Sequence, residues 1–362
     1  MGNIVDYVRE FGDKSMKEHP FNEADALVLS QFVYLKWEHI IPKLSDNKDA
    51  ITIKKMNKVM HDKNLEGEVF MDDRYEQDNK ALFEAMLASR RFGHLSCDYL
   101  YDDIDKDEET QFFAITAFIP DVLPVVVFRG TDETLLGWKE DFNMAYRAPV
   151  PGQSHASTYI KQVALRLPGG FMTAGHSKGG NLAVYSVLTA PKSLKDRVVC
   201  MYNFDGPGFN REIMEKYDYD SISDRMFKVV PESSIVGVIL ERDDRYKTVT
   251  STARGGAQHN LYTWNIYDGR LDYVENVSTA SRVFRDSITV WMDQTDPDKR
   301  EVVFGTVYDI LEASDASTTI ELKRELKRNR KTSLNMLKAA LNVPDDTWDR
   351  FKSVMKEFKL QL

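Results

Sequence analysis

The chain has 362 residues, of which 42% are hydrophobic and 29% charged. This composition is ordinary for a globular protein and excludes a collagen, a mostly disordered chain and a disulfide-stapled miniprotein. The formal net charge of −9 argues against general nucleic-acid binding, which needs a basic surface. No apolar run approaches the roughly 20 residues that span a bilayer, and the N-terminus lacks the basic and apolar regions of a secretory signal. We therefore expect a cytoplasmic protein without a transmembrane segment.

The first half of the chain changes from helical to strand-like patterning. Asn22 and Asp25 have the spacing of a helix-capping pair, and a second helical stretch is expected over about 74–91. Three short segments rich in aromatic and β-branched residues then predict strands, at 95–101, 112–119 and 122–128. The last of these is apolar almost throughout, which is typical of a strand covered on both faces.

Helices and strands alternate in the second half. The expected ranges are 154–167, 179–189 and 210–217 for helices, and 170–174, 197–203 and 226–230 for strands. Such alternation implies parallel strands joined by crossover helices, and therefore an α/β architecture. Two short strands should flank the turn at Asp268-Gly269, and the remainder from about 277 to 362 is expected to be helical.

These patterns divide the chain into three parts: an N-terminal helical segment packed on the core (1–70), the core (71–295) and a C-terminal helical extension (296–362). The extension carries six basic and two acidic residues over 321–331, followed by an apolar face that begins at Trp348. Docking of this helix on the body is one interpretation, and contact with a partner or an anionic surface is the other. Cys97 and Cys200 lack metal-ligand spacing, so we expect buried thiols, with a disulfide as the alternative.

The strongest chemical motif lies at residues 175–179, where the sequence Gly-His-Ser-Lys-Gly fits G-x-S-x-G. This pattern places a serine nucleophile, here Ser177, on a sharp turn from a strand to a helix. Small residues two positions on either side let the strand and the helix pass closely, and the helix N-terminus favours developing negative charge. A glycine-rich turn with a bystander serine is the alternative, but the expected strand before the motif and helix after it favour the nucleophile.

A serine nucleophile needs a base, and the chain order on this fold is serine, acid, histidine. His259 is the only histidine after Ser177 and is therefore the predicted base, whereas His176, beside the serine, is predicted to be a structural support. Asp205 directly follows the strand after the nucleophile helix, where a carboxylate would orient the imidazole. Glu232, after the next strand, is the competing acid.

Acyl transfer also needs donors for the oxyanion. The backbone N–H of Lys178, the residue after the nucleophile, should be one of them. Thr131 follows the apolar strand at the junction from which the second donor comes, so we predict its N–H, with its hydroxyl as an additional candidate. This chemistry requires no metal and no organic cofactor.

Several of these segments resemble known families. The stretch 126–131, the stretch 137–142 and the Gly-His-Ser-Lys-Gly-Gly motif resemble the class-three (fungal-type) lipases. A closer resemblance is to the bacterial Mbeg-like α/β-hydrolase family, a domain of unknown function, and it rests on residues 21–27, 202–209, 231–237 and 258–264. The resemblance covers about residues 20 to 270. It implies an α/β-hydrolase fold with a mostly parallel sheet and helices on both faces, in which Ser177 matches the nucleophile and His259 the family histidine.

Two further features follow from comparing this sequence with those families. Class-three lipases carry their acid in an Asp-Ile-Val-Pro segment, but the matching stretch here, 234–237, reads Ser-Ile-Val-Gly. Asp205 and the four residues after it instead resemble the acid-bearing loop of pancreatic-type lipases, which ranks Asp205 above Glu232. The segment 132–150, where class-three lipases hold a lid helix, is rich in large apolar residues. A lid over an acyl-chain groove and a helix packed on the body are the two interpretations.

The sequence thus predicts a serine hydrolase of the lipase or esterase type that cleaves a carboxylic ester through an acyl-enzyme on Ser177. A small-molecule or lipid ester is the expected substrate, with transient contact to a lipid surface compatible with it and no nucleic acid involved. The alternatives are a thioesterase or peptidase with the same site, and a non-catalytic hydrolase-fold binding protein. A carboxylate within hydrogen-bond reach of the His259 ring favours the enzyme. The oligomeric state is not predicted.

Overall fold

The computed structural model describes residues 1–314, apart from 47, 72–74, 106 and 133–134, together with the isolated positions 332, 335, 336, 339, 349 and 352. The side chains of residues 135, 136 and 138 are also outside this description. The basic stretch and the apolar face expected in the C-terminal extension lie outside the described residues. Within the described part of the chain, no helix combines the length and the apolar composition needed to cross a membrane.

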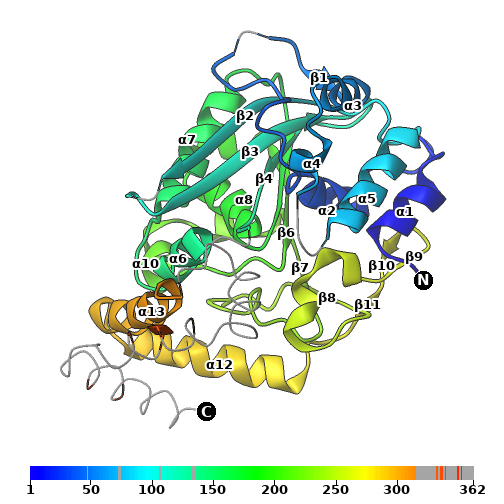
Figure 1. Cartoon of the computed structure of the whole chain (residues 1–362). Helices are drawn as coiled ribbons and strands as arrows, with labels where there is room; N and C mark the ends of the chain where they lie inside the picture. The colour runs from blue at the N-terminus through cyan, green and yellow to red at the C-terminus, as the bar shows by residue number, and fades with distance from the viewer. Residues whose placement is uncertain are drawn as a thin grey trace.

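A mixed β-sheet forms the centre of the molecule (Figure 1). The strands are β1 (Ile51–Thr52), β2 (Ser96–Asp105), β3 (Thr110–Phe118), β4 (Val125–Phe128), β5 (Phe171–His176), β6 (Val198–Phe204), β7 (Met226–Pro231), β8 (Lys247–Val249), β9 (Ile266–Tyr267), β10 (Arg270–Leu271) and β11 (Tyr273–Val274). In the described residues nine of them pair in the order β1-β2-β3-β4-β5-β6-β7-β8-β11. Neighbours from β1 to β4 are antiparallel, those from β4 to β8 are parallel, and β11 closes the edge antiparallel to β8.

The helices lie on both faces of this sheet (Figure 1). They are α1 (Ile4–Phe11), α2 (Glu23–Phe32), α3 (Ile53–Asp62), α4 (Glu66–Val69), α5 (Glu76–Ala88), α6 (Leu135–Asn143), α7 (Pro151–Ala164), α8 (Lys178–Leu188), α9 (Lys192–Lys195), α10 (Arg211–Lys216), α11 (Asp220–Ser223), α12 (Thr279–Gln294) and α13 (Pro297–Glu312), with the 3₁₀ turns η1 (Gly255–His259) and η2 (Leu261–Thr263). One face is covered by α1, α2 and α5, and the other by α7 and α8.

Strand β4 shows why both faces need a cover. Val125 and Val127 belong to the buried cluster beneath the N-terminal helices, whereas Val126 and Phe128 belong to the cluster beneath α7 and α8. Alternate side chains of a strand point to opposite faces, so a strand that is apolar throughout must be buried on both. The prediction for this strand is confirmed, and its buried position fixes the chain just before Thr131.

The N-terminal helices supply a complete layer of the fold. The predicted cap is confirmed, because Asn22 Oδ1 accepts the N–H of Ala24 at 2.7 Å and the Asp25 carboxylate accepts the N–H of Asn22 at 2.9 Å. Every residue of α2 is buried, which is expected of a helix enclosed by other elements. The helix ends at Phe32.

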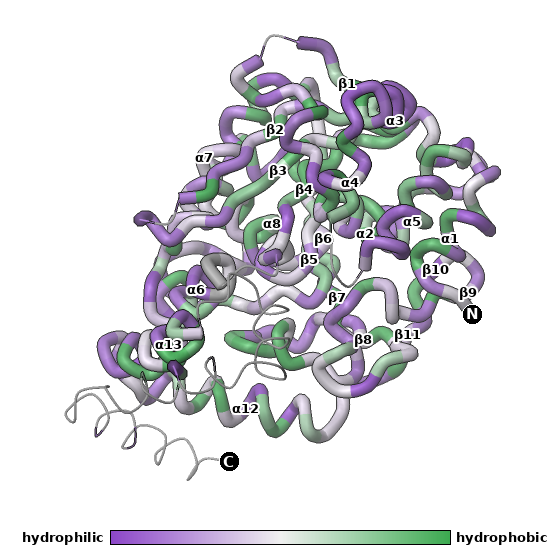
Figure 2. Tube along the Cα trace, viewed as in Figure 1, coloured by the Kyte–Doolittle hydropathy of each residue, from purple (hydrophilic) through white to green (hydrophobic). Residues whose placement is uncertain are grey.

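Of the described C-terminal helices, α13 packs against α6, and α12 joins a small cluster beside it. Trp291 and Met292 of α12 and Val303 of α13 share a small buried cluster with Ala145 and Leu240. Figure 2 shows hydrophobic and hydrophilic residues alternating along α12, as expected of a helix with one buried side. The helical prediction is confirmed for these two helices.

Other expectations were met in part. The hairpin at Asp268-Gly269 is present between β9 and β10, with positive φ at both turn residues, as a two-residue type I′ turn requires. Strands β8 and β11 were not predicted, because two or three residues are too few to show a period. Cys97 and Cys200 are both free thiols.

The topology, with helices on both faces of a sheet whose parallel half is β4 to β8, is an α/β-hydrolase fold.

Candidate active site

Ser177 occupies a sharp turn between β5 and α8. Its φ of 56° lies in the left-handed region, which is strained for a residue with a side chain. A Cβ on Gly175 would lie 2.2 Å from the carbonyl oxygen of Gly179, and one on Gly179 would lie 2.2 Å from that of Phe128. The two glycines of the motif are therefore needed so that strand and helix can pass closely, and the strand, turn and helix expected from the motif are all present.

His259 and Asp205 are brought together from distant parts of the sequence. His259 ends η1, and its Nδ1 lies 2.6 Å from Asp205 Oδ2 at the end of β6. The Asp205 side chain is buried, whereas that of His259 is 30% exposed. Because Nδ1 faces the carboxylate, it carries the proton of this hydrogen bond, and Nε2 is left as the basic nitrogen.

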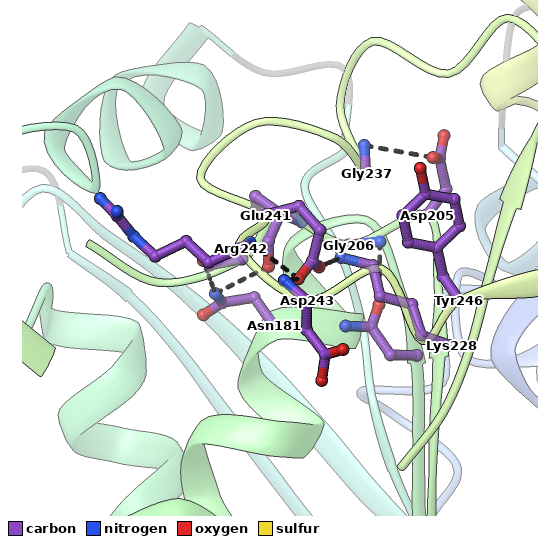
Figure 3. A network of polar contacts seen from close by, with 12 residues as sticks. Asn181, Asp205, Gly206, Lys228, Gly237, Glu241, Arg242, Asp243 and Tyr246 are labelled. Atoms are coloured by element: carbon purple, nitrogen blue, oxygen red, sulfur yellow. Dashed lines mark hydrogen bonds and ion pairs between the residues drawn. The ribbon is translucent and has the colours of Figure 1, made fainter. Parts of the chain in front are cut away.

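The segment 234–237, which lacks the acid of the class-three lipases, holds the Asp205 carboxylate in place. Ser234 Oγ donates to Asp205 Oδ1 at 2.5 Å. The N–H of Gly237 donates to the same oxygen at 3.1 Å, as Figure 3 shows. A Cβ on Gly237 would lie 2.2 Å from that oxygen, so only glycine fits there. Glu232 makes backbone hydrogen bonds to Val249 and Ser278, and in the described residues its carboxylate contacts no histidine. The structure thus places Asp205, not Glu232, against His259.

Asn181 of α8 holds the loop that carries Asp205. Asn181 Nδ2 donates to the carbonyl oxygens of Pro207 at 3.1 Å and Gly208 at 2.9 Å. Nearby, Lys228 and Glu241 form a buried ion pair that folds back the chain after β7 (Figure 3). Asn181 therefore supports the loop of the carboxylate, and the ion pair supports the neighbouring chain after β7.

His176 supports His259 and is not placed to act as the base. Its Nε2 donates to the backbone oxygen of His259 at 2.9 Å, so Nδ1 is the acceptor, and the hydroxyl of Tyr34 donates to it at 2.9 Å. The two imidazole rings lie 4.4 Å apart between centroids. Burial, and then the nearby His259, lower the pKa of His176 well below its usual range, so this ring is neutral at physiological pH.

Thr131 and Lys178 present two N–H groups beside the serine. Within the described part of the chain neither N–H has a hydrogen-bond acceptor. A Cβ on Gly130 would lie 3.2 Å from Ser177 Cβ, so the loop after β4 abuts the serine. The Thr131 hydroxyl donates to Asp141 Oδ2 at 2.6 Å, which leaves the N–H as the group free to face a substrate. Burial raises the pKa of Asp141 to about 6, against the opposing effects of Lys178 and of the Thr131 hydrogen bond.

Helix α6, in the segment 132–150 that could have been a lid, packs on the body of the protein. Phe142 of α6 stacks on Phe304 of α13 at 5.7 Å, and Glu140 of α6 forms a fully buried ion pair with Lys178 at 2.7 Å. A cavity of about 610 Å³ is lined by residues 38–43, 46, 48–51 and 55, none of which is a site residue.

Sequence reasoning missed several side chains that shape the site, among them those of Tyr34, Gln111, Glu140 and Asp141. Tyr34 and Gln111 carry no local motif, because their contacts arise only when the N-terminal layer and β3 are in place. Glu140 and Asp141 stand side by side in a largely apolar segment, and that pair of carboxylates was a usable signal.

Comparisons with known proteins find one matching family and a similar solved structure. The Mbeg1-like family model matches residues 86–309. A solved structure titled "Crystal structure of M37 lipase" is similar at a TM-score of 0.37 and 16% sequence identity, over 60% of this chain and 70% of that one. No curated protein matches the chain in sequence.

Proposed function

The chain belongs to the Mbeg1-like family, and from the geometry of its site we propose that it is a serine hydrolase of the lipase or esterase type. The observation that carries the proposal is the pairing of His259 Nδ1 with Asp205 Oδ2 at 2.6 Å. The His259 ring lies 4.4 Å from that of His176, the residue before the serine held at φ 56°. A serine, a histidine and a buried carboxylate in this order are the parts of a catalytic triad.

In the proposed reaction His259 Nε2 takes the proton of Ser177 Oγ as that oxygen attacks the carbonyl carbon of an ester. The N–H groups of Thr131 and Lys178 donate to the oxyanion of the tetrahedral intermediate, and Asp205 stabilises the imidazolium. The imidazolium then protonates the leaving alkoxide, and an acyl-enzyme on Ser177 remains. Water attacks this ester with the same base and the same oxyanion donors, which releases the acid and restores the serine.

The pairing of Asp205 with His259 favours an enzyme over a binding protein with a decayed site. In a decayed site the carboxylate partner of the histidine is no longer needed, yet here Asp205 accepts from Ser234, Gly237 and His259. The same groups would also cleave a thioester or a peptide bond, so the substrate that binds decides which of these reactions the site performs. We propose a small-molecule or lipid carboxylic ester in a cytoplasmic setting.

Labelling with a fluorophosphonate probe tests this proposal. The wild type should be labelled at one serine, Ser177→Ala should abolish the label, and His259→Ala should slow it by about 10³-fold or more, since removal of a triad member is typically that costly. Hydrolysis of p-nitrophenyl esters of increasing chain length should be lost in the same variants. A folded wild type that is not labelled, with or without detergent or lipid vesicles, would favour the binding protein.

A further inference from the structure

The side chain of Lys178 has no part in the proposed mechanism, which uses only its N–H. That side chain nevertheless runs into the interior and is fully buried. Its Nζ donates to Glu140 Oε2 at 2.7 Å and to the carbonyl oxygen of Gln111 at 2.8 Å. Burying two charges is costly, and well-packed apolar residues of similar size are often as stable or more so. The pair is therefore poorly explained by stability alone.

Glu140 connects the pair to the walls of the site. Besides Lys178 it accepts the N–H of Gln111 at 3.1 Å and the N–H of Gly152, at the start of α7, at 2.6 Å. The Gln111 side chain in turn accepts the N–H of Asp132 at 3.2 Å. Strand β3, the loop after β4, helix α6 and the turn at Ser177 thus meet at this one ion pair.

We infer that the buried Lys178–Glu140 ion pair is a positioning device for the oxyanion site, an inference that rests on the proposed function. Lys178 is the residue directly after the strained Ser177, and its side chain is anchored to the same group of contacts that holds the loop of Thr131. The anchor fixes the direction of the Lys178 N–H relative to the Thr131 N–H. Glu140 touches no reacting atom, so it acts through Lys178.

Strain at the serine explains why such an anchor is useful. A residue at φ 56° persists only where its surroundings hold it. The charges of Lys178 and Glu140 compensate each other, so the pair brings no net charge to the oxyanion, and its effect is on geometry. Removing one oxyanion donor typically costs about 10²–10³-fold in kcat, and a displacement of about 1 Å costs about 10²-fold.

The test uses a variant that removes both charges together. Lys178→Met combined with Glu140→Gln removes both charges of the pair together and keeps similar side-chain volumes, so it should fold. We expect kcat for p-nitrophenyl butyrate to fall by about 10²-fold with KM changed less than about threefold. Affinity for an alkyl trifluoromethyl ketone, which forms an oxyanion when Ser177 adds to it, should fall by the same factor as kcat. A purely structural role would not change the two in parallel.

Two further variants keep the outcome decisive. Glu140→Asp retains the charge but shortens the anchor, and we expect a loss of about 10-fold in kcat; it decides the question if the double variant does not fold. The matched control is Arg91→Met with Asp25→Asn, which removes another fully buried ion pair that lies in the N-terminal layer. The control should lower thermal stability and leave kcat within about twofold.

The failures of this inference and of the proposed function are distinguishable. If fluorophosphonate labels wild-type Ser177 but the folded double variant and Glu140→Asp match the wild type in kcat and ketone affinity, the positioning role is wrong and the hydrolase stands. If the wild type itself is not labelled, the proposed function is wrong and the positioning role is overturned with it.

Discussion

Two buried carboxylates flank the proposed site, and they are held in different ways. Asp205, on the side of His259, has hydrogen bonds at both oxygens, from Ser234 and Gly237 at one and from His259 at the other. Asp141, on the side of the oxyanion donors, receives the Thr131 hydroxyl at Oδ2. In the described residues its other oxygen is buried without a hydrogen-bond partner.

This difference shows which carboxylate is built to carry charge. Buried charges are tolerated when donors surround them and are costly when they do not. Asp205 is surrounded by donors and is suited to stabilise an imidazolium. Asp141 is under-compensated, and burial raises its pKa to about 6. We therefore expect substitutions of Asp205 to affect catalysis most and substitutions of Asp141 to affect stability most.

The largest effect is expected for Asp205→Asn. The amide keeps the shape but loses the charge, and it can hold His259 in the wrong tautomer. In triads this change lowers kcat by about 10⁴-fold, and we expect a similar loss here, measured with p-nitrophenyl butyrate. Glu232→Gln is the matched control and should stay within about twofold of the wild type. The opposite pattern would assign the acid to Glu232.

A smaller effect is expected for Gly237→Ala. The new methyl group would lie 2.2 Å from Asp205 Oδ1 and 2.7 Å from Val230 Cγ1, so the carboxylate must move. We expect kcat to fall by about 10²-fold and the free energy of unfolding by about 1–3 kcal/mol. Gly256→Ala is the control from the loop of His259, because its nearest neighbour would be Ile235 Cδ1 at 3.6 Å. Equal activities of the two variants would show that Gly237 does not support the acid.

The same contrast separates what the sequence could predict from what it could not. The serine turn, the strand before Thr131 and the position of Asp205 follow from local patterns, because short-range sterics and strand periodicity set them. The structure brings Asp205 and His259 together where the motif order placed them. By contrast, the roles of Ser234 and Gly237 depend on how the chain after β7 returns to β6, and no local rule encodes that return.

The surroundings of the two oxyanion donors were harder to predict from the sequence. The partners of Lys178 and Thr131 come from α6, whose docking depends on packing against α13 and on Gln111 of β3. Apart from the Thr131–Asp141 hydrogen bond, which spans 10 positions, these contacts link residues about 30 to 160 positions apart. Long-range packing of this kind leaves no periodic signal, so the apolar pattern of residues 132–150 was compatible both with a lid and with a packed helix.

The smallest predicted effect concerns the pH dependence of stability at Asp141. Burial raises the pKa of this carboxyl in the folded chain to about 6, above the value of about 4 expected when unfolded. The folded state thus binds this proton more tightly, and the favourable contribution, complete below about pH 4, is lost as the pH rises to about 6. Asn cannot ionise and its oxygen still accepts from Thr131. Between pH 4 and pH 7.5, the free energy of unfolding of Asp141→Asn, measured with urea, should therefore rise by about 1–3 kcal/mol relative to the wild type.

Asp220→Asn, at a carboxylate that is 94% exposed, should show no such gain. If the curves for Asp141→Asn and the wild type stay parallel across this range, Asp141 is not the under-compensated charge of the site, and the contrast with Asp205 is wrong.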